Sequence, residues 1–241
     1  GETKDTLTAL ETAKSFGGKT LAITNVKGST LDYASDYTLL LKAGPEIAVA
    51  ATKSYNTMLL TLYLLAEHMS KKAIDKSGLF ALFEETAALS FDRKFGFPPI
   101  NGICFFIGKG LDYITAREGA LKFKEITYKP TDVQPAGELK HGTIALVDGS
   151  SLVVAVLTDE REKAKTVSAI HELKSRGAYI IVITSLDDIQ ADEVIKIKNI
   201  DPLLSPILAV IPLQRLALYV SKALGLDPDK PRNLAKSVTV D

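Results

Sequence analysis

The fold is decided by a stretch that occurs twice, first as Lys14-Ser-Phe-Gly-Gly-Lys-Thr-Leu-Ala-Ile-Thr24 and, 160 residues later, as Lys174-Ser-Arg-Gly-Ala-Tyr-Ile-Ile-Val-Ile-Thr184. In each copy a helical pattern ends at a glycine, a residue that favours helix C-caps, and an apolar run typical of a buried strand follows. A polar loop, a second short strand (37–41 and 194–197) and a long apolar helix come next in both copies. Strands that alternate with helices predict βαβ units and parallel sheets. We therefore expect two related α/β domains of the flavodoxin-like or Rossmann-like class.

The two copies differ in what precedes them. Before the second copy, the sequence predicts a strand at 103–107, a helix that runs to about Tyr128 and a strand at 151–157. A shift of 160 residues places the counterparts of these elements before Gly1, so the first domain is expected to be incomplete at its N-terminus. The expected organisation is a first domain at 1–70, a helical linker at 71–98, a second domain at 99–225 and a docked C-terminal tail at 226–241.

The composition is that of an ordinary globular protein. Of the 241 residues, 46% are hydrophobic and 24% are charged, and 29 basic and 29 acidic side chains give a formal net charge of zero. Because nucleic-acid binding needs a basic stripe or patch, and none is visible in the sequence, a nucleic-acid partner is not expected. The single cysteine, Cys104, lies in an apolar run typical of a core strand, which excludes an internal disulfide.

The most apolar stretch, residues 203–224, is interrupted by Pro206, Pro212, Arg215 and Lys222. A membrane span needs about 20 uninterrupted apolar residues, so this stretch predicts a buried helix, and no membrane association is expected. A lone buried thiol and the lack of a visible signal peptide favour an intracellular protein, and we expect a cytoplasmic location.

Three segments offer chemistry, and the first is Glu118-Gly-Ala-Leu-Lys122-Phe-Lys-Glu125. The spacing places Glu118, Lys122 and Glu125 on one helix face. This helix follows a glycine-rich turn at the end of a strand, where α/β sheets place ligands. One interpretation is a carboxylate that transfers protons. The alternative is a surface helix in which Glu118 and Lys122 form an ordinary ion pair.

The second segment is Gly137-Glu-Leu-Lys-His141-Gly142, which interrupts the strand–helix rhythm with an irregular loop and a short helical turn. A histidine in such a loop is often functional, although an exposed histidine without a role is an equal alternative. His68 and His171 lie on ordinary helices and are interpreted as structural or surface residues. Three scattered histidines and one strand cysteine do not make a metal site.

The third segment is the tail, Arg232-Asn-Leu-Ala-Lys236-Ser-Val-Thr-Val-Asp241, which is too apolar to remain in water. A docked tail would carry the Lys236 amine into a partly dry place, where an amine becomes a usable nucleophile. At the other end of the chain, Thr3 and Thr6 begin a helix, where their hydroxyls would either bind a phosphate or simply cap the helix. A carboxylate, an imidazole and an amine suffice to open a sugar ring, form an imine and move a proton between adjacent carbons.

These segments, together with Gly1-Glu-Thr-Lys-Asp-Thr6, resemble the isomerase region of the glucosamine-6-phosphate synthase family, which consists of two sugar isomerase (SIS) domains. The resemblance covers essentially the whole chain. It implies that Lys236 forms an imine with open-chain fructose 6-phosphate, that Glu125 moves a proton between C1 and C2, and that His141 assists ring opening from the neighbouring subunit of a homodimer. The residues implied in sugar-phosphate binding are Thr3, Val49, Lys122 and Ala235.

The resemblance implies no cofactor and no metal, but it implies a further partner, a glutaminase domain outside this chain that supplies ammonia. The product would be glucosamine 6-phosphate, an amino-sugar precursor. The family's main phosphate-binding segment would precede Gly1, so weak sugar binding or none is expected of this chain alone. Two alternatives stay open: a stand-alone SIS deaminase or isomerase of amino-sugar phosphates, and a non-catalytic SIS sensor of sugar phosphates.

Overall fold

The computed structural model describes residues 1–73, 75–89 and 100–236. The chain divides into two compact units: unit 1 comprises Gly1–Ala73 and Asp229–Asp241, and unit 2 comprises Ile74–Pro228. Parts of two predicted segments, the linker at 71–98 and the tail at 226–241, fall at positions 74, 90–99 and 237–241, outside the described residues.

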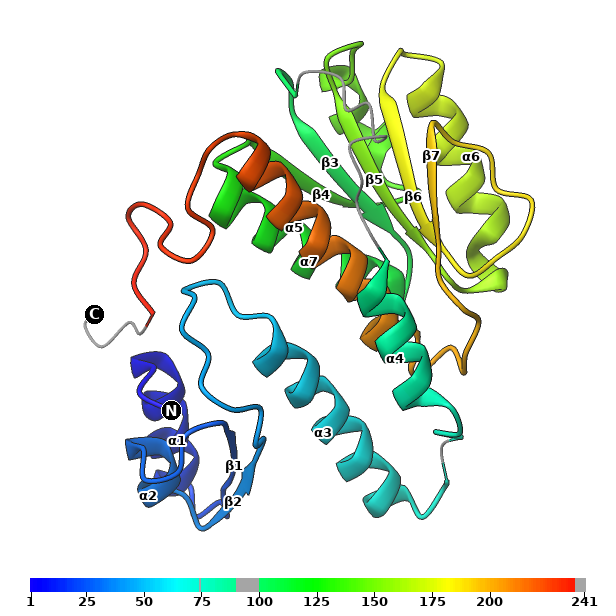
Figure 1. Cartoon of the computed structure of the whole chain (residues 1–241). Coiled ribbons are helices and arrows are strands. Elements are labelled where there is room, and N and C mark those ends of the chain that lie inside the picture. Colours follow the sequence, from blue (N-terminus) through cyan, green and yellow to red (C-terminus); the bar gives the residue numbers. More distant parts are fainter. Residues whose placement is uncertain (74, 90–99, 237–241) are drawn as a thin grey trace. The chain divides into compact units, whose positions relative to one another are not determined.

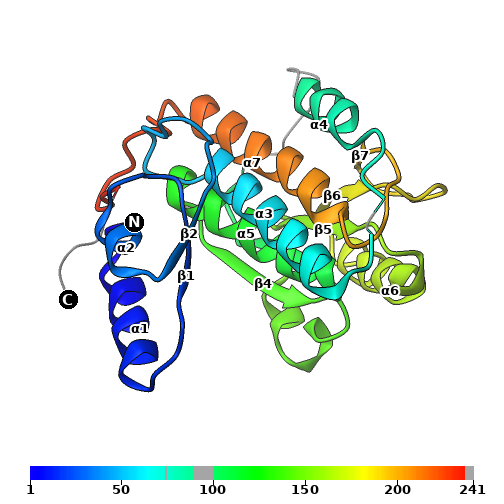
Figure 2. The ribbon, with the colours of Figure 1, turned by 90° about the horizontal axis from the view of Figure 1, so that it is seen from below.

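Unit 1 contains a small parallel sheet with helices around it (Figure 2). Its elements are α1 (Lys4–Ser15), β1 (Leu21–Thr24), α2 (Thr30–Ala34), β2 (Tyr37–Leu40) and α3 (Lys53–Ser70). In the register of the two strands, Leu21 lies opposite Tyr37 and Thr24 lies opposite Leu40. Helix α1 ends as the sequence predicts, because Gly17 adopts φ 75°, a left-handed conformation that costs glycine little.

Unit 2 is built on a five-stranded parallel sheet. The strands are ordered β4-β3-β5-β6-β7 across the sheet. From β3 the chain first adds β4 on one side and then adds β5, β6 and β7 on the other, which is the order of flavodoxin-like folds. The elements in chain order are α4 (Leu79–Ala88), β3 (Cys104–Gly108), α5 (Leu111–Thr127), β4 (Thr131–Pro135), η1 (Leu139–His141), η2 (Thr143–Leu146), β5 (Leu152–Leu157), η3 (Glu160–Glu162), α6 (Lys163–Lys174), β6 (Tyr179–Thr184), β7 (Glu193–Lys196) and α7 (Ser205–Ala223).

The core of unit 2 lies on both faces of this sheet (Figure 1). Helix α6 covers one face, where Ile170 and Leu173 pack with Phe105 and Ile180. Helices α5 and α7 lie side by side on the opposite face (Figures 1 and 2). Strands β3 and β5 are buried along their whole length, as expected for parallel strands covered by helices on both faces.

The predicted duplication is visible in the elements. Adding 160 to the bounds of α1 gives 164–175, one residue from α6, and adding 160 to those of β1 gives 181–184, within β6. The apolar stretch 203–224 forms the buried helix α7, as predicted. Among the helices of the described residues, none combines the length and apolar character that crossing a membrane requires.

Among the strands that the structure describes, β4 is the one that the sequence analysis missed. Its residues, Thr131–Pro135, include three polar side chains and a proline, and the sequence suggested only irregular structure there. Proline is tolerated at the edge of a sheet because an edge strand does not need every backbone N–H. Strand β4 lies at that edge, with Pro135 opposite Gly108.

The close packing of α5 on α7 makes a testable prediction at Gly119. A Cβ atom added there would lie 2.8 Å from Cδ1 and 2.9 Å from Cβ of Leu213, and the Cβ atom of Leu213 cannot rotate away. We expect Gly119→Ala to lower the free energy of unfolding by about 1–3 kcal/mol in urea denaturation. The control is Gly149→Ala, since an added Cβ meets nothing within 4 Å there. Equal stability of the two variants would contradict this packing.

Candidate functional site

A pocket of about 760 Å³ opens in unit 1 where the strands β1 and β2 end. The loop after β1 and the N-termini of α1 and α3 form its walls. Because the N-terminus of α1 presents backbone N–H groups and the positive end of the helix dipole, that wall suits an anionic group. The lining residues are Gly1, Thr3, Thr6, Ile23, Thr24, Asn25, Val26, Lys27, Leu31, Leu41, Gly44, Pro45, Glu46, Ser54, Met58 and Lys236.

Three residues singled out from the sequence line this pocket: Thr3, Thr6 and Lys236. Thr3 is the N-cap residue of α1, but its side chain makes no capping hydrogen bond. The interpretation of Thr3 as a simple helix cap is therefore not supported. Lys236 enters the pocket from the tail, with its side chain 42% exposed.

The amine of Lys236 is bound by a carboxylate that sequence reasoning missed. Nζ of Lys236 lies 3.0 Å from Oε2 of Glu46 and 2.7 Å from the carbonyl oxygen of Ala48. Glu46 lies in the loop between β2 and α3, and its side chain is only 10% exposed. The signal in the sequence was an acidic residue shortly before a long helix, where carboxylates are favoured.

The N-terminus of α3 fixes the Glu46 carboxylate. Oε1 accepts hydrogen bonds from the backbone N–H of Thr52 (3.0 Å) and of Ser54 (3.2 Å), and Oε2 accepts one from the hydroxyl of Ser54 (2.6 Å). Burial by itself would raise the pKa of Glu46, but the hydrogen bonds from Ser54, Thr52 and Lys236 outweigh it and lower that pKa to about 2.

Of the other two residues predicted in this unit, Val49 lies beside the tail and Ala235 is part of it. The N–H of Val49 donates to the carbonyl oxygen of Asp229 at 3.1 Å, which fastens the start of the tail to the loop before α3. Ala235 is exposed and immediately precedes Lys236. Among the described residues, neither Val49 nor Ala235 lines the pocket itself.

In unit 2, helix α5 carries a compact charged cluster. Nζ of Lys122 lies 2.8 Å from Oε2 of Glu125 and 3.6 Å from Oε1 of Glu118. The exposed fractions of the three side chains are only 7% for Lys122, 21% for Glu125 and 13% for Glu118. The alternative of a solvated surface pair is therefore wrong, because all three side chains are largely shielded from solvent.

The burial of this cluster has an electrostatic consequence. The pKa of Glu118 is raised, first because burial disfavours its charge; Lys122 opposes this rise and the nearby Glu125 carboxylate adds to it. Two carboxylates and one ammonium in a partly dry place form the kind of set that holds and transfers a proton.

His141 lies elsewhere in unit 2, in η1, with a side chain that is 65% exposed. Its Nε2 is 4.0 Å from Oε2 of Glu138. A pocket of about 500 Å³ opens beside it, with Lys109, Lys140 and Lys165 in its wall. His141 is thus accessible, as either sequence interpretation of it requires.

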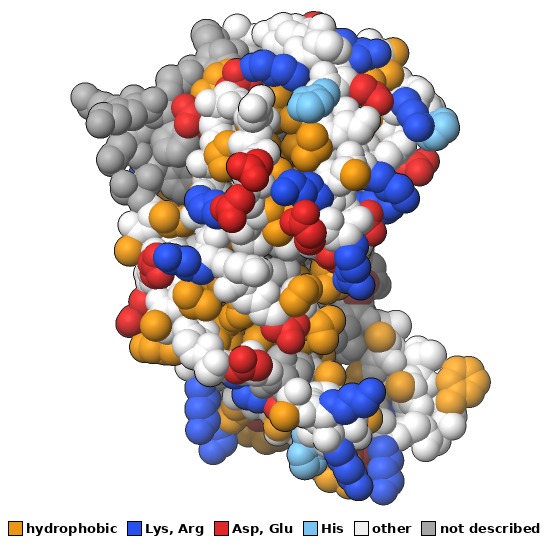
Figure 3. Space-filling view, turned by 90° about the vertical axis from the view of Figure 1, so that its right-hand side faces the viewer, with side chains coloured by type: hydrophobic (Ala, Val, Ile, Leu, Met, Phe, Trp, Pro, Cys, Tyr) orange, Lys and Arg blue, Asp and Glu red, His pale blue; other side chains and the backbone are white. Residues whose placement is uncertain are grey.

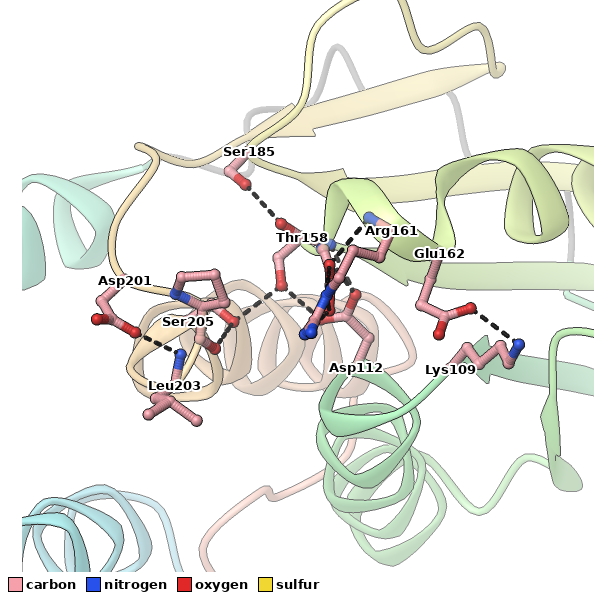
Figure 4. Close-up of polar contacts among 11 residues, drawn as sticks. Lys109, Asp112, Thr158, Arg161, Glu162, Ser185, Asp201, Leu203 and Ser205 are labelled. Atoms are coloured by element: carbon pink, nitrogen blue, oxygen red, sulfur yellow. Dashed lines mark hydrogen bonds and ion pairs between the residues drawn. The ribbon is translucent and has the colours of Figure 1, made fainter.

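A buried polar network lies at the ends of the neighbouring strands β3 and β5, where the strand order of unit 2 switches sides (Figure 4). Asp112 is 2% exposed and accepts hydrogen bonds from the N–H (2.7 Å) and the hydroxyl (2.6 Å) of Thr158, which follows β5. The hydroxyl of Thr158 is also 2.9 Å from that of Ser205 at the start of α7. Burial raises the pKa of Asp112, although the hydrogen bonds from Thr158 oppose this rise. At this crevice, where doubly wound sheets bind ligands, the chain supplies its own carboxylate.

Figure 3 shows basic and acidic side chains interspersed on the face of unit 2 that carries α6 and β7. Ion pairs account for part of this pattern, among them Lys174–Asp192, Lys196–Asp187 and Lys163–Glu160. Among the residues that the structure describes, no group of three or more histidine, cysteine, aspartate or glutamate side chains is placed to hold a metal ion.

The fold and sequence of this chain place it in a known family of domains. A family model of the SIS domain matches residues 1–68 and 103–220, and the chain belongs to this family. The glutamine–fructose-6-phosphate aminotransferase (isomerizing) of Fusobacterium nucleatum is 44% identical over 260 residues, which cover 100% of this chain and 42% of that protein. The chain therefore spans less than half the length of the curated relatives that it matches.

Solved structures agree with this assignment. The C-terminal domain of glucosamine-fructose-6-phosphate aminotransferase from Francisella tularensis is 32% identical, with a TM-score of 0.81 over 95% of this chain and 70% of that one. Glucosamine-6-phosphate deaminase from Thermotoga maritima is 26% identical, with a TM-score of 0.78 over 99% of this chain and 72% of that one. The resemblance inferred from the sequence is confirmed: the chain matches the C-terminal isomerase region of the aminotransferases.

The buried cluster on α5 predicts the effect of Lys122→Met. Removal of the ammonium leaves two carboxylates without their cation, so we expect the free energy of unfolding at neutral pH to fall by about 3 kcal/mol. The deficit should shrink in acid, because Glu118 takes up a proton. Urea denaturation at several pH values measures both effects. Lys124→Met, an exposed change on the same helix, is the control, and a Lys122→Met variant as stable as this control would contradict the cluster.

The lowered pKa of Glu46 predicts a pH signature for unit 1. When folding lowers the pKa of a carboxyl group, that group stabilises the protein at every pH above its ordinary pKa, which is 4.5 here. This stabilisation is lost as the pH falls from 4.5 toward the folded-state pKa of about 2. The stability of the unaltered chain should therefore decline through this window by on the order of 2 kcal/mol more than that of Glu46→Gln. Denaturation curves at stepwise acidic pH measure the difference. Parallel pH profiles for the two proteins would refute the prediction.

Proposed function

We propose that this chain carries out the isomerase part of glucosamine 6-phosphate synthesis, in which fructose 6-phosphate and ammonia become glucosamine 6-phosphate. The observation that carries the proposal is the Lys236 amine in a pocket whose other wall is the N-terminus of α1, with Thr3 and Thr6. An amine and an anion site in one pocket fit a phosphorylated sugar that carries a carbonyl group. The 44% identity to an isomerizing aminotransferase supports the same substrate.

The proposed chemistry begins at the C2 carbonyl of the open-chain sugar. The lone pair of Lys236 Nζ attacks C2, water leaves, and an imine forms. Ammonia then replaces Lys236 at C2 and releases the lysine amine. The Glu125 carboxylate takes a proton from C1 and returns one to C2, while the proton of the C1 hydroxyl is lost and the imine nitrogen gains one. The product has an aldehyde at C1 and an amine at C2. Lys122, 2.8 Å from Glu125, balances the charge of that carboxylate before the transfer.

The remaining roles concern binding and partners. Thr3 and the start of α1 would hold the phosphate, while Val49 and Ala235 would border the sugar. His141 would assist ring opening, and its exposure fits a residue that acts across the interface of a homodimer. Ammonia would come from a glutaminase domain of the same protein, and the reaction would take place in the cytoplasm without metal or cofactor.

A deaminase acting on amino-sugar phosphates is the second candidate, and the likeness to the Thermotoga maritima deaminase favours it. That identity, 26%, is well below the 44% shared with the aminotransferase. The combination of Glu125, His141 and Lys236 weighs against the third candidate, a sensor, because sugar-phosphate binding alone requires neither a nucleophilic amine nor a proton carrier.

The proposal predicts a trapped imine. The chain is incubated with fructose 6-phosphate and borohydride and weighed by mass spectrometry. Reduction should add the mass of one sugar phosphate less one oxygen atom, and peptide mapping should place it on Lys236. Lys236→Arg should give no adduct, because arginine keeps the positive charge but forms no such imine, whereas Lys14→Arg on α1 should behave like the unaltered chain.

A protein extended upstream is tested in parallel, because the family's phosphate segment would precede Gly1. An adduct at another lysine, or none in the extended protein, would overturn the role of Lys236. Retained sugar-phosphate binding without an adduct would instead support the sensor.

A further inference from the structure

We propose that Glu46 is a positioning residue for the reactive amine: its carboxylate holds Nζ of Lys236 in the pocket of unit 1. This inference rests on the proposed function for its catalytic meaning and on hydrogen-bond geometry for its structural basis.

The first step is that Glu46 is a fixed anchor. Three hydrogen bonds from Thr52 and Ser54 tie its two oxygens to the first residues of α3, which is 18 residues long. A carboxylate at a helix N-terminus is further stabilised by the helix dipole. With 90% of its side chain covered, Glu46 has little freedom to follow a moving partner.

The second step is that the two carboxylate oxygens of Glu46 bind different partners. Oε1 accepts only from the backbone of α3 among the hydrogen bonds given above, whereas Oε2 accepts from the Ser54 hydroxyl and from Lys236. The carbonyl oxygen of Ala48, from the same loop, is the second acceptor for the amine at 2.7 Å. A single loop between β2 and α3 therefore sets the position of Nζ.

The third step concerns the tail. Residues 232–236 are exposed, so apolar burial contributes little to fixing this part of the chain. The bond between Val49 N–H and the Asp229 carbonyl fastens the tail seven residues before Lys236. The contacts of the amine with Glu46 and Ala48 tie the end of this segment to the pocket.

The fourth step separates positioning from proton transfer. A carboxylate with a pKa near 2 is a weak base at neutral pH, so Glu46 is poorly suited to take the proton that Lys236 must lose before it attacks a carbonyl. Its contribution is to hold the amine where the substrate arrives, and another base accepts the proton.

The first test measures, without any sugar, how strongly Glu46 restrains the amine of Lys236 from reacting. The chain is treated with a trace of acetic anhydride at fixed pH, and acetylation of Lys236 is compared by peptide mass spectrometry with that of Lys14 in the same molecule. Loss of a charge-assisted hydrogen bond should raise the relative labelling of Lys236 roughly tenfold in Glu46→Gln. Glu11→Gln, an exposed change on α1 that removes the same charge, should leave labelling unchanged.

The second readout is imine trapping with fructose 6-phosphate and borohydride in the extended protein. Glu46→Gln should trap several-fold more slowly than the unaltered protein, while the sugar concentration at half-maximal rate changes little, because the phosphate contacts remain. Circular dichroism establishes that each variant is folded. If Glu46→Gln does not fold, Ser54→Ala removes one bond from Oε2 and should shift both readouts in the same direction by a smaller factor.

The outcomes separate the two proposals. Unchanged labelling of Lys236 in a folded Glu46→Gln variant would overturn the anchoring role while leaving the proposed function intact. Unchanged trapping in that variant, with normal trapping in the unaltered protein, would overturn the positioning role in the reaction. No imine in the unaltered extended protein would overturn the proposed function, and the catalytic role of Glu46 with it.

Discussion

Parallel strands bring the N-termini of the following helices to one edge of a sheet, and the N–H groups that gather there need acceptors. In unit 2 the chain supplies one itself, the Asp112 carboxylate, which Thr158 binds through its N–H and its hydroxyl. In unit 1 the Glu46 carboxylate does the same for α3 through Thr52 and Ser54. The N-terminus of α1 instead opens onto a pocket. The N-terminus of α1 therefore differs from the other two sites in facing open space.

A second constraint on the structure is the cost of burying the charged side chains of α5. Burying Lys122 with Glu118 and Glu125 is costly, and an apolar face of the same volume would often be at least as stable. The cluster therefore contributes little net stability to α5 compared with an apolar face. Its acid–base state is sensitive to Glu118, whose raised pKa keeps it closer to protonation than a solvated glutamate. The two units thus hold carboxylates of opposite tendency, since the pKa of Glu46 is lowered.

Most of the fold followed from local pattern. The apolar runs, the glycine at position 17 and the 160-residue repeat predicted the strands, helices and parallel pairing, because these signals act over a few residues. Strand β4 was missed because its sequence is mostly polar and ends in a proline. The spacing of Glu118, Lys122 and Glu125 predicted a shared face, but their burial depended on tertiary packing.

Long-range contacts in the site were beyond reach from sequence alone. Lys236 was predicted as the amine, yet its acceptor Glu46 lies 190 residues earlier, and no local pattern connects the two. The same limit applied to Asp112 and Thr158, which are 46 residues apart and meet only because β3 and β5 are neighbours. Residue types in a motif indicate chemistry, whereas the partners that tune that chemistry come from topology.

The repeat also places equivalent residues of the two units in different surroundings. Thr24 and Thr184 occupy equivalent positions at the ends of β1 and β6, and each hydroxyl accepts a hydrogen bond from the N–H two residues later. The hydroxyl of Thr184 donates to the carbonyl oxygen of Leu157 at 2.6 Å and is fully buried. Thr24 lines the open pocket beside Thr3. A hydroxyl committed to a neighbouring strand cannot also bind a ligand, whereas one at a pocket wall can. Of the two equivalent hydroxyls, that of Thr24 therefore faces a pocket, whereas that of Thr184 serves the fold.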